Sequence, residues 1–193
     1  DHTGRFLISA NNAKNYATRT GNFSINAIGE RGVAQAPYEM FRTPVKLHSI
    51  HADPTNRYLF GASCDGDVIV RYKFDEVTGT VDPDPLPSVM VMKRTGPRHM
   101  VFHPNNRFMY LLGEYSADVY VFRYDSSKGS LHEIQIASAV PPDFSPVVRS
   151  EKAGFSNSGA DLHFTPDGRW LYCSVRAPST IAAFGVDPLT GIL

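Results

Sequence analysis

The stretch His103-Pro-Asn-Asn-Arg107-Phe-Met-Tyr110 decides the fold, because the chain repeats it. The other copies are Asp53-Pro-Thr-Asn-Arg57-Tyr-Leu-Phe60, Thr165-Pro-Asp-Gly-Arg169-Trp-Leu-Tyr172 and, shortened at its start, Asp1-His-Thr-Gly-Arg5-Phe-Leu-Ile8. Proline presets φ, and Asn or Gly tolerates the left-handed region, so the first half of each copy predicts a turn. The alternation of aromatic and aliphatic residues after the arginine predicts a strand that begins there.

Each complete copy also ends in the same way. An aspartate lies 18 residues after the repeat arginine, and a glycine follows four residues later. The aspartates are Asp75, Asp125 and Asp187, and the glycines are Gly79, Gly129 and Gly191. Chance does not keep one spacing at three places, and hairpins of an ordinary β-sandwich would not keep it either. Units of about 50 residues with four antiparallel strands each are typical of the blades of a β-propeller. The sequence therefore predicts an all-β propeller.

Composition narrows the class of partner. Of the 193 residues, 42% are hydrophobic and 20% are charged, which is ordinary for a globular protein. Lys plus Arg and Asp plus Glu both number 19, so the formal net charge is zero. This balance gives no electrostatic basis for binding nucleic acid or an anionic membrane. The two cysteines, Cys64 and Cys173, form no disulfide framework, and this usage favours a cytoplasmic location.

The repeat also locates a candidate site. The residue nine before the repeat arginine is His48 in one unit and Arg98 in the next, and the residue seven after it is Glu114 and then Arg176. These two positions are nearly equidistant from the turn between two antiparallel strands, so they emerge at the same end of the hairpin. The same end of every blade opens on the same face of a propeller. The four side chains are therefore predicted to meet at one mouth of the central channel.

The residue types at this mouth favour an anionic ligand. Each arginine presents a planar fork that matches carboxylate or phosphate, and two forks suit a small molecule with several negative charges. One carboxylate beside two permanent cations argues against a metal ion, and no cofactor is expected. The alternative is purely structural, with Glu114 pairing with Arg98 or Arg176 as a salt bridge between blades.

Several motifs carry a family resemblance. They are His48-Ser49, Gly96-Pro-Arg-His-Met-Val-Phe-His-Pro104, Pro142-Asp-Phe-Ser145, and Ala160-Asp-Leu-His163 followed by Pro166-Asp-Gly-Arg-Trp-Leu-Tyr172. With them the chain resembles the lactonase family of seven-bladed β-propellers, which includes bacterial 6-phosphogluconolactonase and the fungal 3-carboxy-cis,cis-muconate cyclase. Seven blades need about 350 residues. We therefore expect residues 1–193 to be one propeller domain truncated at one or both ends, with about four of seven blades present.

The resemblance implies a function and a site. The family's proposed site is a histidine, two arginines and a glutamate, which correspond to His48, Arg98, Arg176 and Glu114. His48 or Glu114 would transfer the proton, Arg98 and Arg176 would bind the substrate, and His99 would brace Arg98 or touch the ligand. Gly113 and Val175 depart from the family pattern, in which Asn is frequent at these places.

Three functions stay open at this point. The first is hydrolysis of a sugar-acid lactone such as 6-phosphogluconolactone, which bears a phosphate. The second is an intramolecular lyase, or cyclase, that forms a lactone from 3-carboxy-cis,cis-muconate. The third is a propeller that serves as a non-catalytic binding platform. The oligomeric state is also open.

Three other histidines receive structural interpretations. His163 and His51 share a position six residues before the repeat arginine, where the intervening unit has Val101. An apolar equivalent predicts a core histidine at both places. His103 occupies the turn slot and is predicted to be structural.

Overall fold

The described part of the chain is built from β-strands. The computed structural model describes residues 1–193 except for 12–19, 37–38, 84–85, 145–147, 151–153 and 156. Within these residues no helix is present, and so no helix that could cross a membrane. The strands fall into two compact units, residues 1–90 and 91–193. The prediction of an all-β chain is confirmed.

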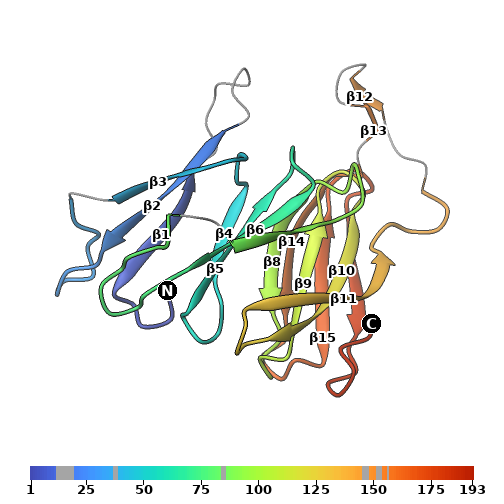
Figure 1. Ribbon diagram of the computed structural model, residues 1–193. Helices are drawn as coiled ribbons and strands as arrows, with labels where there is room; N and C mark the ends of the chain where they lie inside the picture. The colour runs from blue at the N-terminus through green and yellow to red at the C-terminus, as the bar shows by residue number, and fades with distance from the viewer. Residues whose placement is uncertain (12–19, 37–38, 84–85, 145–147, 151–153, 156) are drawn as a thin grey trace. The chain divides into compact units, whose positions relative to one another are not determined.

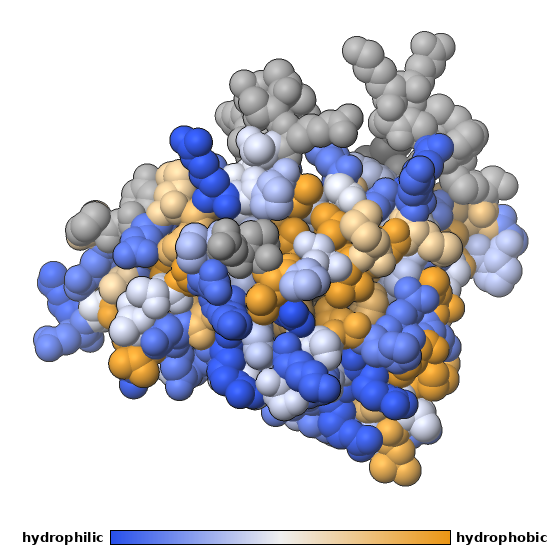
Figure 2. Space-filling view, in the orientation of Figure 1, coloured by the Kyte–Doolittle hydropathy of each residue, from blue (hydrophilic) through white to orange (hydrophobic). Residues whose placement is uncertain are grey.

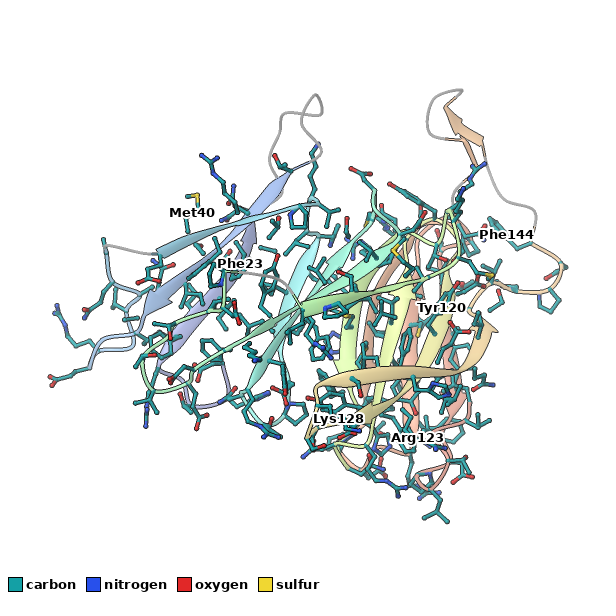
Figure 3. All side chains as sticks on the ribbon, in the orientation of Figure 1. Phe23, Met40, Tyr120, Arg123, Lys128 and Phe144 are labelled. Carbon is teal, nitrogen blue, oxygen red and sulfur yellow. The ribbon has the colours of Figure 1, made fainter. Side chains whose placement is uncertain are left out.

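The first unit contains two antiparallel sheets. One has the order β1-β2-β3 and the other the order β4-β5-β6-β7. The strands are β1 (Phe6–Asn11), β2 (Gly21–Ala27), β3 (Glu39–Thr43), β4 (Ser49–Ala52), β5 (Tyr58–Ser63), β6 (Val68–Lys73) and β7 (Leu86–Met90). Strand β1 lies against β4, and Phe23, Leu59 and Tyr72 belong to the core between the sheets. In Figure 3 Phe23 lies inside this unit, whereas Met40 points away from β3 and is exposed.

The second unit contains two further antiparallel sheets and a short hairpin. The sheet orders are β11-β10-β9-β8 and β14-β15-β16, and the hairpin is β12-β13. The strands are β8 (Pro97–Phe102), β9 (Phe108–Gly113), β10 (Asp118–Asp125), β11 (Ser130–Ser138), β12 (Val148–Ser150), β13 (Gly154–Phe155), β14 (Gly159–Phe164), β15 (Trp170–Val175) and β16 (Thr180–Gly185). Strand β14 lies against β8 and β9, as Figure 1 shows. Tyr110, Val119 and Cys173 are fully buried in the core of this unit.

The repeated stretch forms the predicted turn and strand in each complete copy. Strands β5, β9 and β15 begin directly after Arg57, Arg107 and Arg169. One backbone hydrogen bond of 2.9 Å closes every copy: the N–H four residues before the arginine donates to the carbonyl of the residue after it. The pairs are Asp53–Tyr58, His103–Phe108 and Thr165–Trp170. His103 also accepts at Nδ1 from the N–H of Asn105 at 3.0 Å, which confirms its structural role in the turn.

Two of the repeat glycines, Gly79 and Gly191, each pack against an aromatic ring of the preceding sheet. Gly79 and Gly191 have φ of +77° and +80°, in the left-handed region that favours glycine. A Cβ at Gly191 would lie 2.5 Å from Cδ1 of Phe108, and a Cβ at Gly79 would collide with the ring of Phe6 in the same way. Both rings belong to the residue directly after a repeat arginine. Glycine at these two positions is therefore explained by backbone conformation and by sheet packing together.

The surface carries both hydrophilic and apolar residues. On the face shown in Figure 2, hydrophilic residues are interspersed with apolar ones. The four sheets of three or four strands match the blades predicted from the repeat.

Candidate active site

In the second compact unit, Arg98 lies at a β-bulge of strand β8. The β8–β9 ladder pairs Phe102 with Met109 and continues in step to His99, which pairs with Leu112. The register then shifts, because the next pair is Pro97 with Gly113, so Arg98 is the extra residue. The ladder of β14 with β15 shifts at the corresponding place, between Gly159 and Leu162. In the first unit the β4–β5 ladder runs from Ala52 to Ser49 without a shift. Bulges re-aim side chains and are frequent beside active sites.

Backbone hydrogen bonds join the two sheets of the second unit beside these bulges. The N–H of Gly159 donates to the carbonyl of Glu114 at 2.9 Å, and the N–H of Asn157 donates to the carbonyl of Tyr115 at 2.9 Å. A Cβ at Gly159 would collide with the carbonyl oxygen of Gly113, so only glycine permits this approach. A Cβ at Gly113 would lie 2.5 Å from the carbonyl oxygen of Thr95. The asparagine that the family resemblance leads one to expect at position 113 therefore has no room here.

Glu114 lies between two arginines. Its Oε2 lies 3.5 Å from Nε of Arg98, and its Oε1 accepts a hydrogen bond of 2.9 Å from Nη2 of Arg176. Arg98 comes from the bulge in β8, Glu114 directly follows β9, and Arg176 directly follows β15. The side chains are 16%, 26% and 42% exposed in that order, so the group is half-buried and reachable from solvent. We call this group the arginine clamp.

Main-chain carbonyls of the second sheet hold both guanidinium groups. Nη1 of Arg98 donates to the carbonyl of Ala160. Nε of Arg176 donates to the carbonyl of Ser158, and its Nη2 donates to that of Gly159, both at 3.2 Å. Glu114 balances one of the two positive charges, so the clamp keeps a net charge of one. Fixed guanidinium groups with surplus positive charge suit a carboxylate or phosphate ligand.

A second cluster adjoins the clamp. Nδ1 of His99 lies 2.7 Å from Oδ1 of Asp161, and Nε2 of His163 lies 3.0 Å from Oδ2 of the same carboxyl group. Burial raises the pKa of Asp161, but the hydrogen bonds from His99 and His163 outweigh it and hold this pKa below its ordinary value. The sequence reasoning missed Asp161. One signal in the sequence could have found it. Asp161 lies eight residues before its repeat arginine, and the preceding copy of the repeat has His99 at the same position.

The prediction of a core histidine at position 163 is wrong. The side chain of His163 is 76% exposed. Asp161 lies two residues away on the same strand and provides a hydrogen-bond acceptor at the surface, so His163 is satisfied without burial. Val101, at the equivalent position in β8, did not predict this exposure, because no aspartate lies two residues before it on its own strand.

Comparison with known proteins places the chain in a family. Residues 1–193 match the lactonase family described as a 7-bladed β-propeller. The chain belongs to this family. The lactonase-family chain is 33% identical over 189 residues to a 6-phosphogluconolactonase of Pectobacterium carotovorum, which covers 97% of this chain and 52% of the relative. A 6-phosphogluconolactonase of Yersinia pestis is 33% identical over 187 residues and is covered to 51% of its length. The chain thus spans about half the length of these relatives.

Solved structures agree with the family fold. A candidate 6-phosphogluconolactonase from Bacteroides fragilis is 25% identical with a TM-score of 0.76, over 98% of this chain and 53% of the other. The periplasmic gluconolactonase PpgL of Pseudomonas aeruginosa is 24% identical with a TM-score of 0.79, over 100% of this chain and 53% of the other. The second likeness bears on the fold alone. The fold of the chain is a partial β-propeller of the lactonase type.

The remaining predicted site residue of this lactonase-family chain, His48, belongs to the first unit. It directly precedes β4, is half-buried, and donates its backbone N–H to the carbonyl of Ala62 at 2.7 Å. Its convergence with the clamp stays a prediction.

Within the described part of the chain, no group of three or more His, Cys, Asp and Glu side chains is arranged to hold a metal ion. Cys64 and Cys173 are free cysteines. Burial, followed by the negative charge of Asp161, raises the pKa of the Cys173 thiol to about 12, so this cysteine stays protonated and unreactive at neutral pH.

Proposed function

We propose that the protein hydrolyses a sugar-acid lactone that carries a negative charge, and that 6-phosphogluconolactone represents this class. The observation that carries the proposal is the clamp: one carboxylate spaces two guanidinium groups at 3.5 and 2.9 Å from its oxygens. The names of the relatives from Pectobacterium and Yersinia support the same chemistry. An uncharged ligand would have no use for the surplus positive charge.

The clamp has two tasks in this proposal. One guanidinium binds the phosphate or carboxylate of the substrate, and the other faces the oxyanion that develops when water attacks the lactone carbonyl. Both tasks rely on donors that are already fixed, and the carbonyls of Ala160 and Ser158 fix them.

Glu114 suits a spacing role better than a role as general base. Each of its oxygens faces a guanidinium group, so taking a proton from water would weaken both ion pairs. The base is therefore expected to be a histidine.

The test compares three substrates with the complete gene product. Acid release should be measured at constant pH with 6-phosphogluconolactone and with uncharged gluconolactone, after subtraction of spontaneous hydrolysis. We expect kcat/KM to be at least about 10²-fold higher for the phosphorylated lactone, because one charge-assisted contact contributes about that factor. Loss of ultraviolet absorbance of 3-carboxy-cis,cis-muconate should be followed in parallel.

Each outcome separates the candidate functions. Faster hydrolysis of the charged lactone supports the proposal. Turnover of the muconate alone would overturn it in favour of the cyclase. Turnover of no substrate would overturn it in favour of a binding platform.

A further inference from the structure

We propose that His99 is the general base of the lactone reaction and that Asp161 is its positioning residue. The inference rests on the proposed function and names the group that moves the proton. The repeat positions predict His48 as the base. We assign this role to His99 instead, because its Nδ1 contacts the carboxyl group of Asp161.

The bulge in β8 directs two consecutive side chains to the same neighbour. In a regular strand, successive side chains point to opposite faces of the sheet. Here Arg98 reaches the carbonyl of Ala160 and His99 reaches the carboxyl group of Asp161, so both contact β14. His99 is therefore placed beside the clamp. A regular strand would have separated it from Arg98.

The bulge in β14 positions Asp161, the partner of His99. Asp161 lies within the register shift of the β14–β15 ladder. Its backbone N–H donates to Oγ of Ser174 at 3.0 Å, and its Oδ1 accepts from the N–H of Leu162 at 3.0 Å. These contacts fix both the main chain and the carboxyl group. The two bulges thus face each other across the seam between the sheets, each with one half of the His99–Asp161 pair.

The charge state of Asp161 decides the tautomer of His99. The pKa of Asp161 lies below its ordinary value, so the group is a carboxylate at neutral pH and can only accept hydrogen bonds. Nδ1 of His99 must then carry a proton, and the lone pair of the neutral imidazole lies on Nε2. An orienting carboxylate at Nδ1 with a basic Nε2 is the arrangement that general-base histidines use.

Charged and titratable side chains surround the His99–Asp161 pair. His163 on β14 contacts the carboxyl group of Asp161, and Arg98 precedes His99 on β8. Glu114 and Arg176 lie beyond Arg98 in the clamp. Cys173, on β15, stays protonated. Asp161 is thus the anion in direct contact with His99.

The chemical step balances without any further reactant. Nε2 of His99 accepts a proton as a water oxygen bonds to the lactone carbonyl carbon. The tetrahedral intermediate then breaks its bond to the ring oxygen, and the imidazolium returns the proton to that oxygen. Lactone and water become a hydroxy acid, and His99 ends neutral as it began.

The experiment uses variants of the complete gene product acting on 6-phosphogluconolactone. Asp161→Asn keeps the shape and removes the charge, and it should lower kcat by about 10–100-fold with little change in KM. His99→Gln should lower kcat by about 10²–10⁴-fold. The exposed His132 on β11 provides the control, and His132→Gln should behave as wild type. Melting temperatures confirm that all three variants fold.

The tautomer of His99 supplies a readout that a structural role would not move. Nitrogen NMR of histidine-labelled protein should show the proton of the neutral ring on Nδ1 of His99, with the signal assigned by His99→Gln. Asp161→Asn should weaken this preference for Nδ1, because a neutral amide can donate as well as accept at that place.

The possible failures are distinguishable. Wild-type kcat in both the Asp161 and His99 variants, with hydrolysis lost in Arg98→Ala, would overturn this inference and leave the proposed function standing. An unchanged tautomer preference of His99 in Asp161→Asn would remove the positioning role. If the gene product hydrolyses no lactone, the proposed function fails, and the role of His99 as base fails with it.

Discussion

Strands β9 and β15 hold the same repeat positions in different surroundings. Phe108 and Tyr110 on β9 are 1% and 0% exposed, whereas the equivalent Trp170 and Tyr172 on β15 are 44% and 43% exposed. Residues of the β14–β15–β16 sheet share the core cluster of Phe108 and Tyr110. Among the described residues, no further sheet covers Trp170 and Tyr172 in the same way. The repeat therefore specifies a strand with two packing faces, and the neighbouring sheet decides whether both are buried.

The burial of Phe108 and Tyr110 also involves the turn that follows the next sheet. Gly191 packs on the ring of Phe108, and the hydroxyl of Tyr110 donates to the carbonyl of Gly191 at 2.6 Å. By the same rule, the glycine of a following blade would pack on Trp170. The comparison thus turns a repeat into a series of expected contacts, each of which a substitution can test.

The largest effect is expected at Phe108. Phe108→Ala should lower the free energy of unfolding by about 3–5 kcal/mol, because it removes a buried ring and leaves a cavity under Gly191. Urea unfolding of the complete gene product measures it. Leu189→Ala, at a side chain that is 73% exposed, is the control and should change stability by less than about 0.5 kcal/mol.

Trp170→Ala in the same experiment would sharpen the comparison. The seven-bladed family fold predicts a cost close to that of Phe108→Ala in the complete gene product. A cost near that of Leu189→Ala would show that Trp170 stays exposed there, and that equivalence along the repeat ends at β15.

The next effect separates packing positions from site positions. Arg98 occupies a place where the next copy has Ala160, so the repeat does not need an arginine there for its shape. Arg98→Ala should lower kcat/KM for 6-phosphogluconolactone by about 10²-fold or more. Its urea midpoint should stay close to that of wild type. A loss of stability as large as that of Phe108→Ala, with unchanged activity per folded molecule, would instead identify Arg98 as a brace between sheets.

The sequence predicted what repetition determines and missed what register determines. The starts of β5, β9 and β15 follow from the residue types after each arginine. The contact of Arg98 with Glu114 follows from their equal distance from one turn. The His99–Asp161 pair did not follow, because it depends on two β-bulges, and no residue type in either strand marks a bulge. His163 was misjudged for the related reason that its acceptor lies on its own strand.

A smaller effect is expected at the glycines. Gly191 and Gly32 have similar φ, +80° and +72°, but a Cβ at Gly32 would meet nothing within 4 Å. Gly32→Ala should therefore cost only the left-handed conformation, about 1–2 kcal/mol. Gly191→Ala should cost about 1–2 kcal/mol more, because the methyl group collides with Phe108. Urea unfolding of both variants gives the difference, and equal costs would contradict the packing of this turn on β9.

The smallest effect concerns the aspartates that open the turns after β10 and β16. Oδ1 of Asp125 accepts from the N–H of Ser127, and Oδ1 of Asp187 accepts from the N–H of Leu189. The pKa of Asp125 is held below its ordinary value chiefly by the side chain and N–H of Ser127, and that of Asp187 chiefly by the N–H of Leu189 and the side chain of Thr190. A carboxyl group with a lowered pKa in the folded state stabilises the fold above its unfolded pKa, which is about 3.9, and this contribution is lost as the pH falls through the folded value.

Replacement of either aspartate by asparagine keeps the turn geometry and removes the charge. Asp125→Asn and Asp187→Asn should each lower the melting temperature slightly at pH 6, and the gap to wild type should close as the pH falls below about 3.9. Strand β11 follows the turn that Asp125 opens. The pattern should be the same for both variants, because each carboxylate is stabilised by donors inside its own turn. A gap that persists at low pH for Asp125→Asn alone would show that this turn depends on β11 rather than on its aspartate.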